Sequence, residues 1–416
     1  KKFIDKNSPI IKVKNTRKAL SKISHHFFNS PSKIMKVVGV TGTNGKTSVA
    51  QIVKSILNSL GNKCGAIGTL GLSFDGNISS TNLTTPESIE LHGMLRTLLD
   101  NKINYSALEV SSHSLEQSRV EDIDFNVTVF TNLTHDHLDY HKTMDNYFNA
   151  KLKLFTDLGT SASSIINIDD SFGRKIFNSI SSNKISYGFD KNADISASKI
   201  RSSLDKTEFS LKVFGDRFEI GTNLIGDYNI LNIMASVGAI VSLGFDASDI
   251  VDNINSLDLL IPGRMELVAK NADRYIYVDY AHTPDSYQKI FENIKSINDG
   301  YQLVSLFGCG GNRDCEKRSK MGAISEKYCD RIFITSDNPR NEPLDKIMLD
   351  ILKGFKHNKH EVVKDRKDAI ENAIKSMKKK SILVVLGKGR EEYQEVDGEK
   401  FFFSDVDIIK NYMYAN

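Results

Sequence analysis

Hydrophobic and polar positions along the chain alternate between short apolar runs and segments with helical spacing. The first clear pattern begins at residue 36, where an apolar run leads into a glycine-rich turn and then a helix that stops at Gly61. Another helix is expected to open at Thr85, with a capping hydroxyl followed by Pro86. Strands are expected at residues 36–40, 105–110, 127–133 and 164–168. Strands that alternate with helices predict an α/β fold with a doubly wound, mainly parallel sheet.

The segment from Ile261 to Arg264 predicts a hinge, and the alternation restarts after it. Strands are expected at residues 275–280, 303–307, 331–335 and 381–386, with helices between them. This length fits a second α/β domain. The first 34 residues hold a short apolar segment and one expected helix, residues 17–28, which is too little for a domain. The predicted organisation is therefore 1–34, 35–259 and 260–416.

Composition narrows the range of functions. The net charge is +3 and the lysines are scattered, which argues against nucleic-acid binding. No apolar stretch approaches the roughly 20 residues of a membrane span, and no signal peptide is visible, so a cytoplasmic protein without membrane insertion is expected. The four cysteines are irregularly spaced, which favours reduced thiols.

A phosphate-binding loop is predicted between the first strand and its helix, at Gly39-Val-Thr-Gly42-Thr-Asn-Gly45-Lys46-Thr47. Glycines let backbone N–H groups surround phosphate oxygens, and the helix N-terminus adds positive potential. Lys46 can reach the terminal phosphates, and the Thr47 hydroxyl can bind Mg²⁺. Val40 stands where the common pattern of this loop has its first glycine.

Three segments are dense in polar groups beside apolar runs: residues 108–113, residues 131–141 and the expected helix 144–155, which carries Lys151. The first two lie at the carboxyl ends of expected strands, where open α/β sheets bind ligands. A carboxylate and a histidine there could hold Mg²⁺ between ATP and a reacting group. Residues 135–139 also fit a zinc or two-metal hydrolase site, or structural histidines, and the residues alone leave these alternatives open.

Nine motifs occur in order along the chain: GVTGTNGKT, LTTPES, LEVSSHSLEQSRV, FTNLTHDHLDYHKTMDNYFNAKLKLF, PGRME, VDYAHTPDS, FGCGGNRD, SDNPRNEP and GKGREEYQ. Together they closely resemble the Mur ligase family, from about residue 10 to the C-terminus. Within the family, they resemble the members that add meso-diaminopimelate as the third amino acid of the cell-wall peptide. The resemblance implies a partial UDP-binding domain (1–34), a central ATP-binding domain (35–259) and a Rossmann-like amino-acid-binding domain (260–416).

The resemblance also implies an activity. ATP would phosphorylate the D-glutamate side-chain carboxylate of UDP-N-acetylmuramoyl-L-alanyl-D-glutamate, and the amine of meso-diaminopimelate would then attack the acyl phosphate. Activation is needed because a carboxylate is a poor electrophile, whereas phosphate is a good leaving group, and fixed cations stabilise the developing charge. ATP is a substrate, Mg²⁺ is the implied cofactor, and a monomer is expected.

Carried over motif by motif, the resemblance assigns roles on the ATP side. Lys46, Glu109, His137 and Lys151 would be catalytic, and Lys151 matches the lysine that the family carbamylates to make an anionic oxygen donor. The metal ligands would be Thr47, Glu109, His137 and the Lys151 carbamate. The ATP-binding residues would be Gly42, Thr43, Asn44, Gly45, Lys46, Thr47, Asn229, Asn232, Arg264, Asp279 and His282.

The resemblance further implies two substrate pockets. The sugar–dipeptide would be held by Thr84, Thr85, Ser111, Gln117 and Arg119. Diaminopimelate would be held by Arg313, Asp337, Asn338, Arg340, Gly387 and Glu391. Diaminopimelate has a second carboxylate that an arginine fork can hold by two charged hydrogen bonds, and Glu391 would meet the distal ammonium. L-lysine lacks that carboxylate, so Arg340 argues against a lysine-adding ligase.

Two features depart from the family pattern. Only about 35 residues precede the phosphate loop, so either the chain is truncated or its uridine pocket is reduced. Arg390 stands where the family usually has histidine. Other classes that stay open are a P-loop phosphotransferase or NTPase, which needs neither Lys151 nor the DNPR segment, and a nucleotide-binding protein without ligase activity.

Overall fold

The computed structural model describes residues 10–156, 158–159, 161–181, 183–298 and 300–414. The chain divides into two compact units. Unit 1 comprises Lys1–Ser196 and Asn232–Ile250, and unit 2 comprises Ala197–Leu231 and Val251–Asn416. The domain limits at residues 34 and 259 stay a prediction.

Unit 1 is built on a mainly parallel sheet. Its strands are β1 Lys36–Thr41, β2 Cys64–Gly68, β3 Gly71–Phe74, β4 Asn77–Ser79, β5 Tyr105–Glu109, β6 Val127–Phe130, β7 Ser163–Asn167, β8 Asn183–Gly188 and the start of β9 Ile195–Ser202. They pair in the order β9-β8-β7-β6-β1-β5-β2-β3-β4, and only β3 and β4 run antiparallel to their neighbours. This confirms the predicted doubly wound sheet.

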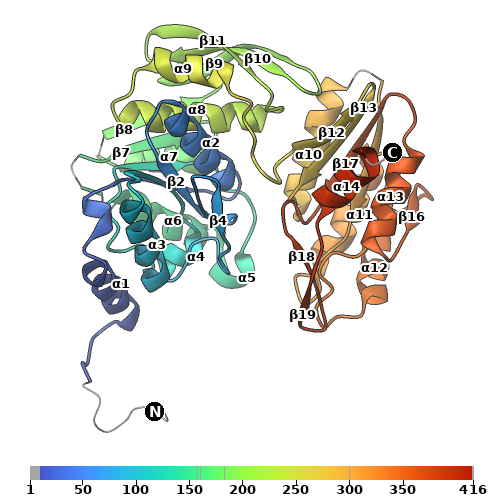
Figure 1. The fold of residues 1–416 in the computed structure, drawn as a ribbon, viewed down its shortest axis with the longest axis horizontal. Helices are drawn as coiled ribbons and strands as arrows, with labels where there is room; N and C mark the ends of the chain where they lie inside the picture. The colour runs from blue at the N-terminus through green and yellow to red at the C-terminus, as the bar shows by residue number, and fades with distance from the viewer. Residues whose placement is uncertain (1–9, 157, 160, 182, 299, 415–416) are drawn as a thin grey trace. The chain divides into compact units, whose positions relative to one another are not determined.

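Helices cover both faces of this sheet (Figure 1). The helices are α1 Thr16–Phe27, the 3-10 helix η1 Pro31–Lys33, α2 Lys46–Ser59, α3 Ser88–Asp100, α4 Ser112–Glu116, α5 Leu138–His141, α6 Met144–Thr156, α7 Ser171–Ser179, α8 Asp227–Ser242 and α9 Ala247–Ser256, the last two shared with unit 2. Apolar residues of α3, α6 and α7 pack with those of β1, β5 and β7 in one core. Because β1 lies between β5 and β6, the polar loops that follow these three strands meet at one edge of the sheet.

Unit 2 holds the hairpin β10 Thr207–Val213 and β11 Asp216–Thr222 and a second sheet. Strands β12 Glu266–Asn271, β13 Arg274–Asp279, β14 Gln302–Phe307, β15 Arg331–Ile334, β16 His360–Val362 and β17 Ser381–Leu386 pair in the order β12-β13-β17-β14-β15-β16. All pairs are parallel except β12 with β13. A small separate hairpin joins β18 Tyr393–Val396 and β19 Glu399–Phe402.

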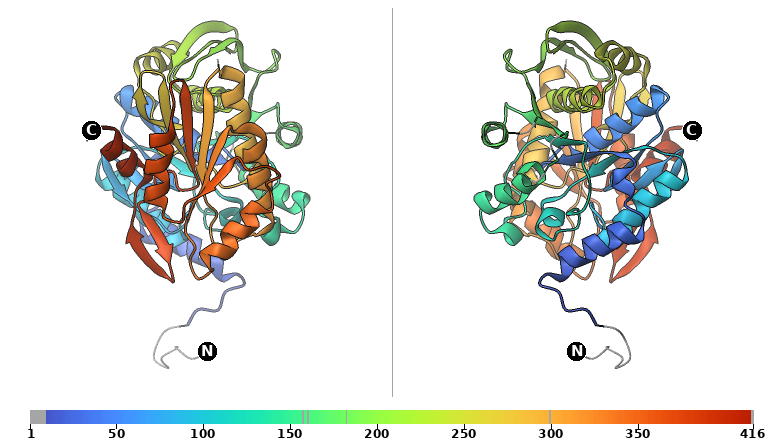
Figure 2. Two further views of the ribbon diagram at one scale, coloured as in Figure 1. Left: turned by 90° about the vertical axis from the view of Figure 1, so that its right-hand side faces the viewer. Right: turned by 90° about the vertical axis from the view of Figure 1, so that its left-hand side faces the viewer.

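The second sheet is also covered on both faces (Figure 2). Helices α10 Pro284–Ile297, α11 Glu316–Tyr328 and α12 Leu344–Leu352 pack in one core, and α13 Arg366–Ser376 and α14 Asp405–Tyr414 pack in another. All four strands predicted here, and the helices predicted around residues 17–28 and 144–155, are present. Among the described helices, none has the length and apolar character needed to cross a bilayer.

One local prediction is wrong. Thr85 does not cap a helix: α3 begins at Ser88, and its N-cap residue is Glu87, whose side chain makes no capping hydrogen bond. The Thr85 hydroxyl instead donates to the backbone oxygen of Glu109 at 2.7 Å. A tertiary hydrogen bond to the end of β5 therefore replaces the local cap.

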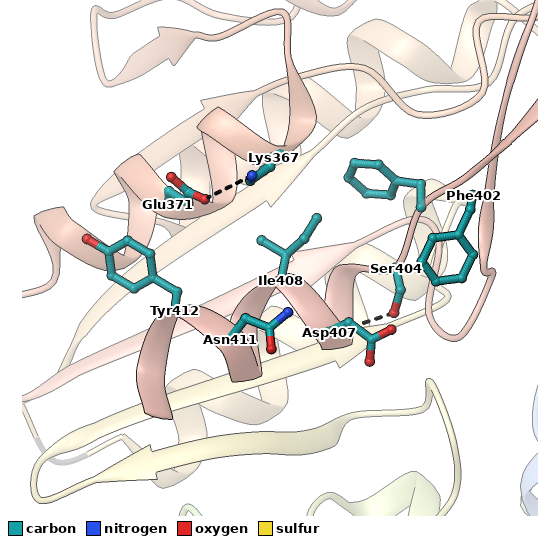
Figure 3. Close-up of a pocket in the computed structure, with 9 residues that line it drawn as sticks. Lys367, Glu371, Phe402, Ser404, Asp407, Ile408, Asn411 and Tyr412 are labelled. Carbon is teal, nitrogen blue, oxygen red and sulfur yellow. Dashed lines mark hydrogen bonds and ion pairs between the residues drawn. The ribbon is translucent and has the colours of Figure 1, made fainter. Parts of the chain in front are cut away.

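A surface cavity of about 470 Å³ lies beside α13 and α14 (Figure 3). Two pairs of its polar groups contact each other: Lys367 with Glu371 at 3.9 Å, and the Asp407 backbone N–H with the Ser404 hydroxyl at 3.2 Å. None of the residues predicted to bind nucleotide or substrate lines this cavity.

Candidate active site

The phosphate loop of unit 1 joins β1 to the N-terminus of α2. Gly45 is the N-cap of α2 and has φ 89°, a conformation that a residue with a Cβ adopts only with strain. A Cβ there would also lie 2.7 Å from Oδ1 of Asn232. Asn132, two residues after β6, holds the loop by accepting from Asn44 N at 3.0 Å and donating to Asn44 O at 3.1 Å. The loop is therefore shaped before any nucleotide binds.

Two lysines converge on this loop. Lys46 Nζ and Lys151 Nζ each donate to the Gly42 carbonyl at 2.9 Å, and Lys46 also donates to the Thr43 carbonyl. Lys151 is 1% exposed and projects from α6 over the Tyr147 ring. Burial lowers the pKa of the Lys151 ammonium well below its usual range, and the Lys46 cation acts in the same direction. The neutral amine form of Lys151 is therefore favoured over the ammonium.

Glu109, the last residue of β5, contacts the phosphate loop through Thr47. Its carboxylate, 2% exposed, accepts from the Thr47 hydroxyl at 3.0 Å, from Thr69 N at 2.8 Å and from the Thr69 hydroxyl at 3.2 Å. Carboxylate and hydroxyl oxygens are ligands that Mg²⁺ accepts, so Thr47 and Glu109 fit this ion. Thr69 was not anticipated, because the short strand β2 that places it was not predicted.

His137 lies after β6, with a left-handed backbone (φ 54°). Burial lowers its pKa to about 4, although Asp136 opposes the shift. The neutral imidazole is the form that ligates metals. Among the described residues, the one group of three acidic, histidine or cysteine side chains close enough to share an ion is Cys315, Glu342 and Asp350, in unit 2. Arg318 already pairs with both carboxylates of that group.

The five residues predicted to bind the sugar–dipeptide lie in one network at the same sheet edge. Thr84 contacts the Thr69 hydroxyl at 3.2 Å, and Ser111 N donates to the Thr85 hydroxyl at 3.0 Å. Arg119 donates to the Thr85 carbonyl at 2.9 Å and to Gln117 at 2.6 Å. The Thr85 hydroxyl of this network also donates to the backbone oxygen of Glu109, so a substrate held there would stand beside the phosphate loop.

The remaining predicted ATP-binding residues lie on α8 and in unit 2. Asn229 and Asn232 are both buried on α8, one turn apart. Asp279 ends β13, and its carboxylate accepts from Met265 N at 2.6 Å and Ala281 N at 2.7 Å. Burial raises the pKa of Asp279, while the nearby Arg264 opposes that shift. The Arg264 guanidinium lies over the Tyr280 ring, and His282 Nδ1 contacts the Tyr280 carbonyl at 2.9 Å.

The predicted diaminopimelate residues of unit 2 cluster at the ends of β15 and β17. Asn338 Nδ2 donates to Glu391 at 2.9 Å, and the side chain of Asp337 faces Gly387, where a Cβ would come within 2.5 Å of Oδ2. Arg340 donates to the Gly311 carbonyl at 3.0 Å and pairs with Glu395 at 3.2 Å. Arg313 is exposed on the neighbouring loop after β14.

Two residues of this pocket were not anticipated. Lys388 is fully buried, donates to Asn338 Oδ1 at 3.0 Å and pairs with Glu391 at 3.2 Å. Glu395 holds Arg340 through its side chain, and its backbone N–H donates to Asn338. A lysine two residues after a buried strand, inside the GKGREEYQ motif, was a usable signal for Lys388. Glu395 lies in a hairpin that the sequence pattern did not predict.

Comparisons with known proteins identify the family of this chain. The Mur ligase middle domain matches residues 40–240, and the Mur ligase, glutamate ligase domain matches residues 263–389. UDP-N-acetylmuramoyl-L-alanyl-D-glutamate--2,6-diaminopimelate ligase 1 of Clostridium acetobutylicum is 40% identical over 98% of this chain and 84% of its own length. The ligases of the same name from Clostridioides difficile and Pseudomonas aeruginosa are 42% and 39% identical, and 84% of each is covered.

Solved structures give the same result. A UDP-N-acetylmuramoyl-L-alanyl-D-glutamate--2,6-diaminopimelate ligase matches with a TM-score of 0.69 and 30% identity, over 96% of this chain and 83% of that one. A folylpolyglutamate synthase of Mycobacterium tuberculosis matches with a TM-score of 0.74 but only 16% identity, which shows a shared fold alone. With both family domains matched and full-length relatives near 40% identity, this chain belongs to the Mur ligase family of ATP-dependent, amide-forming ligases.

Proposed function

We propose that this protein joins meso-diaminopimelate to the D-glutamate side-chain carboxylate of UDP-N-acetylmuramoyl-L-alanyl-D-glutamate, converting ATP to ADP and phosphate. The observation that carries the proposal is the convergence of Lys46, Lys151 and the Thr47–Glu109 pair on one phosphate loop. A phosphotransferase needs the loop and Lys46 but has no use for a buried lysine at the position of Lys151. The substrates are those named by relatives about 40% identical to this chain.

The chemistry follows from the loop. The α2 N-terminus and Lys46 hold the phosphates of ATP, so that an oxygen of the substrate carboxylate takes the γ-phosphoryl group and ADP leaves. The diaminopimelate amine then attacks the acyl carbon, loses a proton, and the tetrahedral intermediate expels inorganic phosphate. Lys46 places a positive charge and hydrogen-bond donors where negative charge develops.

Mg²⁺ is the cofactor that the loop fits. Thr47 and Glu109 would hold one ion, and the neutral imidazole of His137 would be a ligand of a second. When bound, Mg²⁺ neutralises the charge of the transferring phosphoryl group. The depressed pKa of Lys151 favours addition of its neutral amine to CO₂, with formation of an N–C bond and loss of a proton, and the resulting carbamate would supply a further oxygen ligand.

The amino-acid pocket fits a substrate with charges at both ends. Arg340 offers a fork for the distal carboxylate, and Glu391 offers a carboxylate for the distal ammonium. We place the protein in the cytoplasm, in peptidoglycan synthesis, because its proposed nucleotide substrates are cytoplasmic.

The test is phosphate release from ATP with UDP-N-acetylmuramoyl-L-alanyl-D-glutamate and either meso-diaminopimelate or L-lysine. Release that depends on diaminopimelate is expected. A preference for L-lysine would overturn the assigned role of Arg340 while keeping a ligase. Release that needs neither amino acid would favour a phosphotransferase or NTPase.

A further inference from the structure

Within unit 2, the loop Gly387–Glu391 after β17 lies against the segment Gly263–Glu266, which leads into β12. Gly263 has φ 66°, and a Cβ there would lie 2.8 Å from the backbone N of Arg390 and 2.9 Å from Cα of Gly389. Glycine is therefore required at Gly263 both by its conformation and by the approach of the two backbones. The two segments are in direct contact.

A bidentate ion pair joins the same two segments. Arg390 Nε donates to Glu266 Oε2 at 2.8 Å, and its Nη2 donates to Oε1 of the same carboxylate. Glu266 is 5% exposed and also accepts from Gly263 N at 2.8 Å. A fork of two charged hydrogen bonds on a buried carboxylate fixes orientation as well as distance. Unlike an exposed surface pair, this pair therefore fixes the two segments relative to each other.

Each segment carries residues of the proposed active site. On one side, Arg264 and Met265 lie inside the clamped segment, and Met265 N donates to the Asp279 carboxylate. On the other side, Arg390 lies inside a tight turn closed by Glu391 N donating to Lys388 O at 2.9 Å. A movement of Arg390 therefore moves its neighbour Glu391, which contacts Asn338.

We propose that Arg390 and Glu266 form a positioning pair for the amino-acid pocket, fixing the turn that carries Glu391 against the segment that carries Arg264. The pair touches no reacting atom and acts through Glu391. This inference rests on the proposed function, because it assigns Glu391 to the incoming amino acid.

The experiment compares Arg390→Gln with the wild type. Loss of the fork is expected to raise the KM for meso-diaminopimelate and to weaken its binding in calorimetry by about ten-fold, with a smaller change in kcat, because a recognition group is displaced. Arg390→Lys keeps the charge but not the fork, so an intermediate rise is expected, and it also serves if Arg390→Gln folds poorly. Arg331→Gln breaks the exposed Arg331–Glu361 pair of the same unit and is the matched control, expected to change neither constant.

The outcomes separate this inference from the proposed function. Wild-type activity that depends on diaminopimelate, with unchanged KM and binding in both Arg390 variants, would overturn the positioning role alone, even if thermal stability fell. A wild type that neither releases phosphate with diaminopimelate nor binds it would overturn both. Weaker binding in Arg390→Gln but not in Arg331→Gln would support the pair.

Discussion

Two lysines of this protein are equally buried but differ in their surroundings. Lys151 in unit 1 is 1% exposed, and its hydrogen bonds go to neutral oxygens, the Gly42 carbonyl at 2.9 Å and the Thr41 hydroxyl at 3.5 Å. Lys388 in unit 2 is fully buried, but it pairs with the Glu391 carboxylate and with Asn338. The same residue type at the same depth therefore serves two kinds of chemistry.

The difference shows what a partner does to a buried charge. Burial disfavours the charged form of an amine that hydrogen-bonds only to neutral oxygens. This agrees with the lowered pKa of Lys151. Lys388 instead lies beside a carboxylate, and its pairing with Glu391 and Asn338 orients both partners. Lys151 is thus suited to reaction or modification, whereas Lys388 is suited to fixing a recognition pocket.

The largest effect is expected from Lys151→Ala. Removing this group from the phosphate loop should lower kcat by about 10³-fold, because stabilisation of the developing charge is lost. Small carboxylic acids such as acetate should restore part of the activity if a carbamate is the working form. Phosphate release with diaminopimelate measures both.

Lys153→Ala is the control for this variant, since Lys153 lies on the same helix in an exposed pair with Glu116. It should leave kcat unchanged. Rescue of Lys151→Ala by small amines, and not by carboxylates, would show that Lys151 works as a cation and that the carbamate assignment is wrong.

A smaller effect is expected from Arg340→Gln, which removes the fork but keeps a polar side chain. The KM for meso-diaminopimelate should rise by about 10²-fold, since a desolvated carboxylate loses two charged hydrogen bonds. Because L-lysine has no distal carboxylate, the rate of phosphate release with L-lysine should not fall in this variant. Equal losses with both amino acids would contradict the assignment of Arg340 to the distal carboxylate.

Lys388→Met should have a still smaller kinetic effect, a rise of about ten-fold in the KM for diaminopimelate, because Glu391 loses the group that orients it. Stability should also fall by about 3 kcal/mol, since the partners of a buried charge are left behind. Urea denaturation and initial rates measure the two effects. Lys367→Met, which breaks the exposed Lys367–Glu371 pair, should change neither.

The smallest effect concerns stability alone and tests whether burial by itself shifts a pKa. His92 on α3 is fully buried, and neither ring nitrogen has a hydrogen-bond partner among the described residues. Burial lowers its pKa from 6.5 to about 4; His25 adds to this shift and Asp124 opposes it. The unfolded chain then binds a proton first as pH falls, so stability is lost between about pH 6.5 and 4, by about 3 kcal/mol at most.

His92→Leu should flatten this part of the pH profile, which urea denaturation at several pH values would measure. An unchanged slope in the variant would show that His92 is not protonated on unfolding in this range. It would also weaken the argument that burial governs the pKa of Lys151.

Prediction from the sequence was most successful where a motif coincides with a regular element. The loop before α2, with Lys46 and Thr47, and the strands of both sheets that carry long apolar runs were predicted and are present. Short or polar strands were missed, including β2, β8 and the β18–β19 hairpin. As a result, two site residues in or beside these strands were also missed: Thr69, which donates to Glu109, and Glu395, which pairs with Arg340. Such strands are stabilised by their neighbours, so their own residues carry little signal.

The sequence by itself determined the fold class, the phosphate loop and the family, because these depend on periodicity and on ordered motifs that local residues encode. Only the tertiary structure decided which polar groups meet. It placed Lys151 against the Gly42 carbonyl, Thr85 on the end of β5 and Arg390 on Glu266, pairs separated by many residues along the chain. The chemistry of each group depends on burial and on its partner, and both are properties of the packed chain.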